Sequence, residues 1–280
     1  MKRLLLIILL LFAASSVQAR GKTLNVMSFN IRCGFCEKPD DINHWSKRKD
    51  LVADLIRSHR PDLIGLQEAE LFQVRDLAAI LVDYDWVGVG RDDGKDKGEA
   101  NAILFRKARF DLLTQETRWL SATPSQVGKG WDAAFNRTVS IVRLRDRKGA
   151  REFFLFNTHF DHLGQQARLQ SSRLLVDLAK SLAGPLPLIV TGDFNYDNKS
   201  DAYRIVANQL RDAERASNSP AQGGSISFNG FGRSVEPGNK IDFIFVDEAF
   251  DVVSHEIITD LHRGRYPSDH YPLQARLRIR

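Results

Sequence analysis

Acidic, amide and imidazole side chains stand near the ends of the apolar runs of this 280-residue chain. The residues that share this position and this chemistry are Asn30, Glu68, His159, Asp193, Asn195, Asp242, Asp269 and His270. A strand aims the side chain at its end rigidly, and the loop that follows leaves room for a ligand. Converging carboxylates and imidazoles can supply a base, an acid and the groups that orient them. The sequence therefore predicts one site at the strand ends.

The stretch TGDFNYDN at 191–198 ends the apolar run 186–190 with an acid and an amide two positions apart. Residues i and i+2 of an extended chain point to the same side. We therefore expect Asp193 and Asn195 to reach into one site together. A single Asp at a strand end more often makes a turn or caps a helix, so this stretch has meaning only beside the others.

Hard oxygen ligands are prominent among these residues. Glu68, Asp269 and Asn30 would suit Mg²⁺, Mn²⁺ or Ca²⁺, and a few carboxylates around a hydrated ion is the pattern expected for Mg²⁺ beside a phosphate. His159 alone on an apolar strand is typical of a core histidine. Asp242 in the run IDFIFV would be costly to bury without a partner, for which an imidazole is suitable.

The hydrophobic pattern predicts strands and helices that position these side chains. Strands are expected at 23–32, 101–106, 138–144, 152–160, 186–190, 240–246 and 271–279, with a short apolar run at 61–68. Helices are expected at 46–59, 70–81, 164–184 and 201–210. Residues 212–240 are rich in Ser, Gly, Asn and Pro and predict a long surface loop near the site. The strands after this loop would make a poor domain alone, so one α/β domain is expected.

The first residues are typical of a secretory leader. Lys2 and Arg3 precede an apolar run, and Val17 and Ala19 occupy the small-residue positions of a signal-peptidase site. The apolar run is too short to span a membrane as a stable helix. We expect residues 1–19 to be a signal peptide and residues 20–280 to be exported to the periplasm or secreted. An uncleaved N-terminal anchor is the alternative.

Charge names no substrate. The chain has 40 basic and 35 acidic residues, and its basic runs are scattered along its length. Such runs are usually solvated faces or guarded strand edges.

The two cysteines lie close together, Cys33 and Cys36, in the sequence CGFC. A local disulfide is expected in an oxidising compartment, with free thiols or a redox pair as alternatives. A zinc site would need further soft ligands, and no other Cys exists in the chain. The pair is assigned no catalytic role.

Six motifs in this order, MSFNIR, GLQE, FNTHFDHLG, TGDFN, KIDFIFV and YPSDHYPL, resemble the endonuclease/exonuclease/phosphatase superfamily with its deoxyribonuclease I-like fold. The resemblance covers about residues 22–280. It is greatest to small exported bacterial members, through GWDAA and GRYPSDH. It implies an α+β fold, a four-layer α/β/β/α sandwich of two packed mixed sheets with helices on both outer faces and the site at one end.

The resemblance also implies roles for the metal ligands and one histidine pair. Glu68 resembles the main metal ligand, with Asn30 and Asp269 close to the same ion. His270 resembles the histidine that pairs with a carboxylate, here Asp242. This pair would act as the base for an attacking water or as an electrostatic clamp on the phosphate.

The remaining matches concern the phosphate. Asp193 and Asn195 resemble the pair that positions the water and a phosphate oxygen. Glu99 resembles a residue that orients a histidine of the His159 type, although it could also be a surface residue of its turn. Arg137 stands where a phosphate-contacting Arg is found.

The function implied is a metal-dependent phosphoester hydrolase that attacks phosphorus with water, using Mg²⁺ or Mn²⁺, with Ca²⁺ possible. A phosphodiesterase of nuclease type is favoured, acting on DNA, RNA, phospholipid or a small phosphodiester. The alternatives are a phosphomonoesterase for a phosphorylated sugar or lipid headgroup and a non-catalytic binding module. We expect a monomer without a stable protein partner or a transmembrane segment. His162 has no family counterpart, and Phe228 and Phe231 could contact a base, a lipid or nothing.

Overall fold

The structure is a computed structural model that describes residues 23–233 and 240–280. The expected signal peptide at 1–19 lies outside these residues. Within them, none of the helices combines the length and the apolar character that crossing a membrane requires.

Two six-stranded sheets form the centre of the molecule. The first has the order β13 (Phe250–Ile257), β14 (Leu273–Ile279), β1 (Thr23–Asn30), β2 (Leu63–Gln67), β6 (Ile103–Arg106) and β4 (Tyr84–Val87). The second has the order β11 (Arg211–Asp212), β12 (Asp242–Val246), β10 (Leu188–Asp193), β9 (Arg151–His159), β8 (Thr138–Asp146) and β7 (Phe110–Trp119). Each sheet has one parallel pair, β1 with β2 and β9 with β10, so both sheets are mixed. A small ribbon pairs β3 (Ala69–Glu70) with β5 (Glu99–Ala100).

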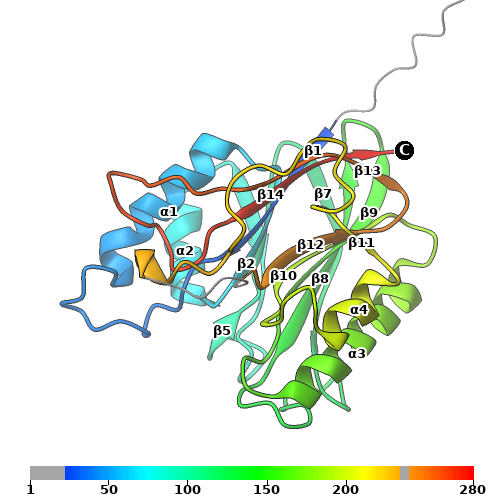
Figure 1. The fold of residues 1–280 in the computed structure, drawn as a ribbon, viewed down its shortest axis with the longest axis horizontal. Helices are drawn as coiled ribbons and strands as arrows, with labels where there is room; N and C mark the ends of the chain where they lie inside the picture. The colour runs from blue at the N-terminus through cyan, green and yellow to red at the C-terminus, as the bar shows by residue number, and fades with distance from the viewer. Residues whose placement is uncertain (1–22, 234–239) are drawn as a thin grey trace, which may run out of the picture.

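Helices cover both outer faces, as Figure 1 shows. Helices α1 (Trp45–His59) and α2 (Leu71–Ile80) pack on the first sheet, and α3 (Gln165–Ala183) and α4 (Asp201–Ala207) pack on the second. A third apolar cluster fills the space between the sheets. Strands that are buried on both faces read as continuous apolar runs, which is why β10 and β12 were recognisable in the sequence. The predicted four-layer sandwich is confirmed.

A buried polar network joins the two sheets below the strand ends. Asn157 on β9 donates to the carbonyl oxygen of Leu66 on β2 at 2.7 Å, and its Oδ1 accepts from Gln67 at 2.6 Å and from Thr191 at 3.0 Å. Gly65 permits this approach, because a Cβ there would lie 2.2 Å from the hydroxyl oxygen of Thr191. Directional bonds of this kind fix how the two sheets register against each other.

The longer strands that the hydrophobic pattern missed are β4, β7 and β13, and each lies at an edge of its sheet. The two-residue strands β3, β5 and β11 were missed as well. Half-exposed polar residues interrupt β7 and β13, so their apolar alternation is weak. Edge strands commonly carry such residues, because charges there oppose pairing with another chain. The last helix, α4, ends at Ala207 and is shorter than expected.

The region 212–240 is only partly the surface loop that was expected, and its residues 234–239 lie outside the described ones. Ser227 is fully buried, and its hydroxyl accepts the backbone N–H groups of Ile241 at 2.9 Å and Asp242 at 3.1 Å. The backbone N–H of Asn229 donates to the carbonyl oxygen of Asp269 at 2.7 Å. The expectation was wrong for this part because polar composition did not reveal that these residues bind the backbone beside the strand ends.

His255 on β13 predicts a pH dependence of stability. The side chain is 1% exposed, and within the described residues neither ring nitrogen has a hydrogen-bond partner. Burial, helped by Lys240 and opposed by Glu214, lowers the pKa of His255 to about 4. The unfolded chain binds this proton near pH 6.5, so acidification from there toward pH 4 favours unfolding.

We therefore expect wild type to lose about 2 kcal/mol more stability than His255→Leu between pH 7.5 and pH 5. Urea unfolding of both proteins at the two pH values measures this difference. Parallel pH profiles would show that the histidine is not held neutral.

Candidate active site

Strand ends from both sheets meet at one end of the sandwich. Asn30 ends β1 and Glu68 follows β2 in the first sheet, and His159 ends β9 and Asp193 ends β10 in the second. The register places Asp193 beside His159 on one side and beside Asp242, the first residue of β12, on the other. The expected convergence of these side chains is therefore present. Glu68, His159 and Asp193 line a pocket of about 450 Å³, whereas Asn30 and Asp242 are not part of its lining.

Asp193 lies at the centre of this group. Its Oδ2 accepts from Nδ2 of Asn30 at 2.9 Å and lies 3.6 Å from Nε2 of His159 and 3.8 Å from Nε2 of His270. Burial, and next the neighbouring charge of Asp242, raises the pKa of Asp193 to about 7. A carboxylate with this pKa can accept a proton near neutral pH.

His270 is bound to Asp242 through Nδ1, at 2.8 Å from the carboxylate Oδ2. Burial disfavours its charged form, but the charge and hydrogen bond of Asp242 prevail and raise the pKa of His270 to about 10. The imidazolium is then the dominant form at neutral pH. Of the two expected roles, this electrostatic state favours a clamp over a base.

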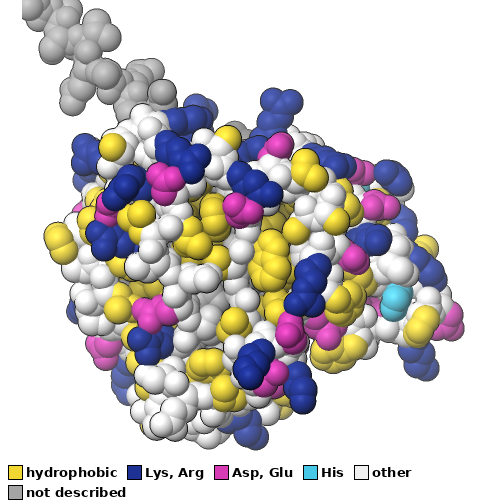
Figure 2. Space-filling view, turned by 180° about the vertical axis from the view of Figure 1, so that it is seen from behind, with side chains coloured by type: hydrophobic (Ala, Val, Ile, Leu, Met, Phe, Trp, Pro, Cys, Tyr) yellow, Lys and Arg dark blue, Asp and Glu magenta, His cyan; other side chains and the backbone are white. Residues whose placement is uncertain are grey.

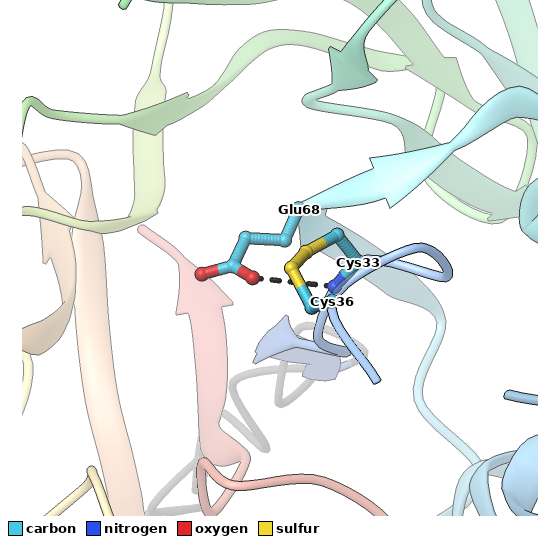
Figure 3. A group of neighbouring side chains, drawn as sticks. All are labelled: Cys33, Cys36 and Glu68. Atoms are coloured by element: carbon cyan, nitrogen blue, oxygen red, sulfur yellow. Dashed lines mark hydrogen bonds between the residues drawn. A yellow bond between two sulfur atoms is a disulfide. The ribbon is translucent and has the colours of Figure 1, made fainter. Parts of the chain in front are cut away.

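Glu68 leaves the line of β2 through a left-handed backbone conformation, with φ of 58°. Its Oε1 accepts from Nδ2 of Asn30 at 3.0 Å, and its Oε2 accepts from the backbone N–H of Cys33 at 3.2 Å (Figure 3). Burial opposes ionisation, but His270, Asn30 and Arg32 outweigh it and lower the pKa of Glu68. Glu68 is thus held as a carboxylate.

Asn30 and Asp269 complete the predicted metal set. Asn30 presents its amide nitrogen to Glu68 and Asp193, while its Oδ1 accepts the backbone N–H of Arg32 at 3.0 Å. Asp269 lies 3.3 Å from a guanidinium nitrogen of Arg32, and burial raises the pKa of Asp269. In this orientation the amide of Asn30 donates hydrogen bonds that hold the carboxylates of Glu68 and Asp193 in place.

The donor atoms fit a divalent cation. Ligand atoms of Glu68, His159 and Asp193 all lie within 4.8 Å of one another. Asp269 is near enough that, in addition to burial, the charge of Glu68 raises its pKa. Oxygen atoms predominate, and buried carboxylates with raised pKa values are relieved by a nearby positive charge.

Arg137, rather than Glu99, makes the close contact with the Nδ1 atom of His159. Its Nη1 lies 3.1 Å from Nδ1 of His159, whereas Oε2 of Glu99 lies 3.8 Å from that atom. Glu99 is bound instead to Arg91, and burial together with Glu68 raises the pKa of Glu99 to about 7. Burial, followed by the charge of Arg137, lowers the pKa of His159 well below its usual value.

Asn195 reaches the site by a different route from the one expected. Strand β10 ends at Asp193, and Asn195 has a left-handed φ of 50°. Its backbone N–H donates to Oδ1 of Asp193 at 3.0 Å, which makes an Asx turn. Asp193 and Asn195 do reach one site, but not because they lie on the same side of an extended strand, as the sequence analysis expected. The turn places the Asn195 amide nitrogen 3.0 Å from Nε2 of His159.

Sequence reasoning missed several residues around Arg137. Asp161 is buried and accepts the Nε of Arg137 at 3.3 Å and the backbone N–H of Gly164 at 2.8 Å. His162 receives Nη2 of Arg137 at 3.1 Å, and its ring stacks on Phe135. The motif FDHLG contained part of the signal, since an acid and an imidazole stand two and three positions after His159. Arg91 offered no such signal, because its surroundings read as a surface turn.

Three aromatic side chains line the pocket, Phe35, Phe135 and Phe228. The ring of Phe228 contacts that of His270 in an edge arrangement, with 5.1 Å between the centroids. Phe231 instead faces the guanidinium of Arg48 and is not part of the pocket lining. Of the two loop aromatics, only Phe228 is in a position to contact a pocket ligand.

A two-sheet sandwich with carboxylate, amide and imidazole groups at one end is the architecture of a class of phosphoester hydrolases. The sequence model of the Endonuclease/Exonuclease/phosphatase family matches residues 27–270, and the chain belongs to this family.

Solved structures agree with this membership. A family protein from Bacteroides vulgatus is 38% identical, with a TM-score of 0.87 over 92% of this chain and 100% of that one. A mannosyl-6-phosphatase from Bacteroides thetaiotaomicron is 35% identical, with a TM-score of 0.85 over 91% of this chain and 99% of that one. Nocturnin from Drosophila melanogaster is 26% identical over 215 residues, which are 68% of this chain but only 32% of that protein.

The contacts of Arg137 lead to a prediction about turnover. A lysine keeps the charge but cannot bind Asp161, His159 and His162 at once. We expect Arg137→Lys to lower kcat about 10- to 100-fold against a phosphoester substrate, with the fold retained. Arg143→Lys is the matched control, because Arg143 lies on β8, the strand that follows Arg137 directly, and binds Glu152 near the surface. Equal kcat values for the two variants would contradict a role for this geometry.

The pair of His270 and Asp242 leads to a second prediction. Asp242→Asn removes the negative charge that sustains the imidazolium, so the pKa of His270 should fall from about 10 toward or below its ordinary value. Titration of the ring nitrogens by NMR in metal-free protein measures it. An unchanged pKa would mean that another group stabilises the charge.

Proposed function

We propose that the chain is a divalent-metal-dependent phosphoester hydrolase in which water attacks phosphorus directly. The observation that carries the proposal is the position of Asp193, within 4 Å of two imidazole nitrogens and with a pKa raised to about 7. A base and a cationic group at one point are what in-line attack on a phosphate requires.

Each role falls to a group of this chain. Asp193 accepts the proton of the attacking water. His270, as an imidazolium, and Arg137 offset the charge that grows on the phosphoryl oxygens, and the Asn195 amide donates to one of them. The proposal needs no covalent intermediate, and no GxSxG or P-loop motif occurs in the sequence.

Glu68 and Asp269 would hold the cation, with Asn30 keeping Glu68 in place. When bound, such an ion supplies positive charge to the phosphoryl oxygens. Mg²⁺ or Mn²⁺ is the expected ion because the proposed ligands are oxygen atoms.

For the substrate class we propose a small phosphomonoester, such as a sugar phosphate. The pocket has about the size of a small ligand, aromatic rings line it, and His162 adds a polar group to its wall. The similarity to a mannosyl-6-phosphatase supports this choice. Among the described residues on the face in Figure 2, basic and acidic side chains are intermixed without a continuous basic band. The phosphodiester that the sequence favoured is the alternative substrate.

Export to the periplasm or medium, with cleavage after Ala19, remains a proposal that rests on the sequence of residues 1–19. Edman sequencing of the protein recovered outside the cytoplasm tests it, and an intact Met1 would contradict it. A monomer is proposed likewise, and light scattering measures it.

Purified enzyme should hydrolyse an aryl phosphomonoester with Mg²⁺ or Mn²⁺ and lose this activity with EDTA.

Asp193→Asn should lower kcat by at least about 1,000-fold, because the base is removed. Glu68→Gln should raise the Mg²⁺ concentration needed for half-maximal rate. The matching aryl diester, assayed in parallel, decides the substrate class, and faster diester turnover would reverse our choice. Metal-independent turnover, or near-normal kcat in Asp193→Asn, would contradict the mechanism.

A further inference from the structure

The disulfide of Cys33 and Cys36 lies against a proposed catalytic metal ligand. The two Cα atoms are 5.4 Å apart, and the backbone N–H of Cys33 donates to Oε2 of Glu68 at 3.2 Å (Figure 3). Both sulfur atoms and a carboxylate oxygen of Glu68 lie within 4.8 Å of one another. The sequence alone showed no third metal ligand beside the two cysteines, but the fold places Glu68 next to them.

Contacts other than the sulfur–sulfur bond also hold this loop. The backbone N–H groups of Gly34 and Phe35 donate to the side chain of Glu70, and the N–H of Cys36 donates to the carbonyl oxygen of Cys33 at 3.4 Å. Gly34 itself packs so closely on Phe72 that a Cβ there would lie 2.3 Å from its ring. The two sulfur atoms should therefore stay near Glu68 when the bond between them is broken.

We propose that reduction of this disulfide creates a site for a thiophilic divalent cation, with Zn²⁺ bound by the two sulfurs and by Glu68. Zinc takes tetrahedral sets of thiolate and carboxylate ligands, and a solvent water completes a set of three protein ligands. Zinc–sulfur bonds of about 2.3 Å separate two tetrahedral sulfurs by about 3.8 Å, a spacing that neighbouring side chains of one short loop can reach.

The chemistry balances with a dithiol reductant. The dithiol gives two electrons and two protons to the sulfur–sulfur bond and becomes a disulfide, while Cys33 and Cys36 become thiols. When Zn²⁺ binds, each thiol releases its proton to solvent and donates an electron pair to the ion.

This site would control the hydrolase, a consequence that rests on the proposed function. Glu68 is the residue that we assign to the catalytic cation, and a carboxylate drawn toward the two sulfurs is no longer free to hold that ion. Zinc at this site should therefore inhibit the reduced enzyme. The oxidised enzyme has no thiolates to bind zinc and should resist the same concentration.

The binding itself is tested with Co²⁺ as a spectroscopic substitute for zinc. The protein is reduced with dithiothreitol, freed of it by anaerobic gel filtration, and titrated with Co²⁺ in excess Mg²⁺. We expect one equivalent to give a thiolate-to-cobalt charge-transfer band and the visible bands of a tetrahedral site, and Zn²⁺ to abolish both. Oxidised protein and reduced protein alkylated with iodoacetamide should show neither. Absence of these bands in the reduced protein would overturn the proposal.

The third ligand is tested by Glu68→Gln, read by the cobalt spectrum because the catalytic rate of this variant also changes with its weakened Mg²⁺ binding. We expect at least about a tenfold loss of Co²⁺ affinity in the reduced variant. Glu37→Gln is the matched control, since Glu37 follows Cys36 directly and binds Arg32 at 2.9 Å. Full affinity in Glu68→Gln, or an equal loss in the control, would overturn the assignment of Glu68.

Activity is the separate final readout. Zinc should inhibit reduced wild type at concentrations that leave the oxidised protein and Cys33→Ser/Cys36→Ser active, and reoxidation after chelation should restore the rate. Because the cobalt bands require no turnover, failure of the proposed function would leave them intact. Equal zinc inhibition of the reduced enzyme and the double variant would show that zinc does not regulate the hydrolase through the two cysteines.

Discussion

The amide of Asn30 binds the two sheets together at the point where the chemistry is proposed. It donates to Glu68 of its own sheet at 3.0 Å and to Asp193 of the other sheet at 2.9 Å. The network around Asn157 lies below it and sets the same register. A shift of one sheet against the other would separate these carboxylates, so the geometry of the site depends on this joint.

The site also depends on charge balance among its buried side chains. Acidic side chains buried at one end of the sandwich cannot all ionise without positive partners. Three of the carboxylates have separate partners: Asp242 has the imidazolium of His270, Asp269 has Arg32, and Glu99 has Arg91. Glu68 shares His270 and Arg32 with two of them. Asp193 is left with a pKa raised to about 7, which is the property that suits a base.

Much of this arrangement could be predicted from the sequence, and the limits have physical causes. Doubly buried strands such as β10 show as continuous apolar runs that end in polar residues, so the positions of Asp193 and Asp242 were readable. Side-chain partners were not, because they depend on how loops approach. Arg137 displaces Glu99 from His159, and an Asx turn, not an extended strand, delivers Asn195. The motif FDHLG showed His162 as a polar residue near His159, but not its contact with Arg137, which lies 25 residues earlier in the chain.

Isotope labelling tests most directly the central claim that the metal-dependent reaction breaks the bond between phosphorus and the ester oxygen and adds an oxygen from water to phosphorus. A phosphomonoester would be hydrolysed with Mg²⁺ in ¹⁸O-water, and the phosphate and alcohol products examined by mass spectrometry. Our account predicts one ¹⁸O in the inorganic phosphate, none in the alcohol, and no product in EDTA. Label in the alcohol, or the same turnover without metal, would contradict it.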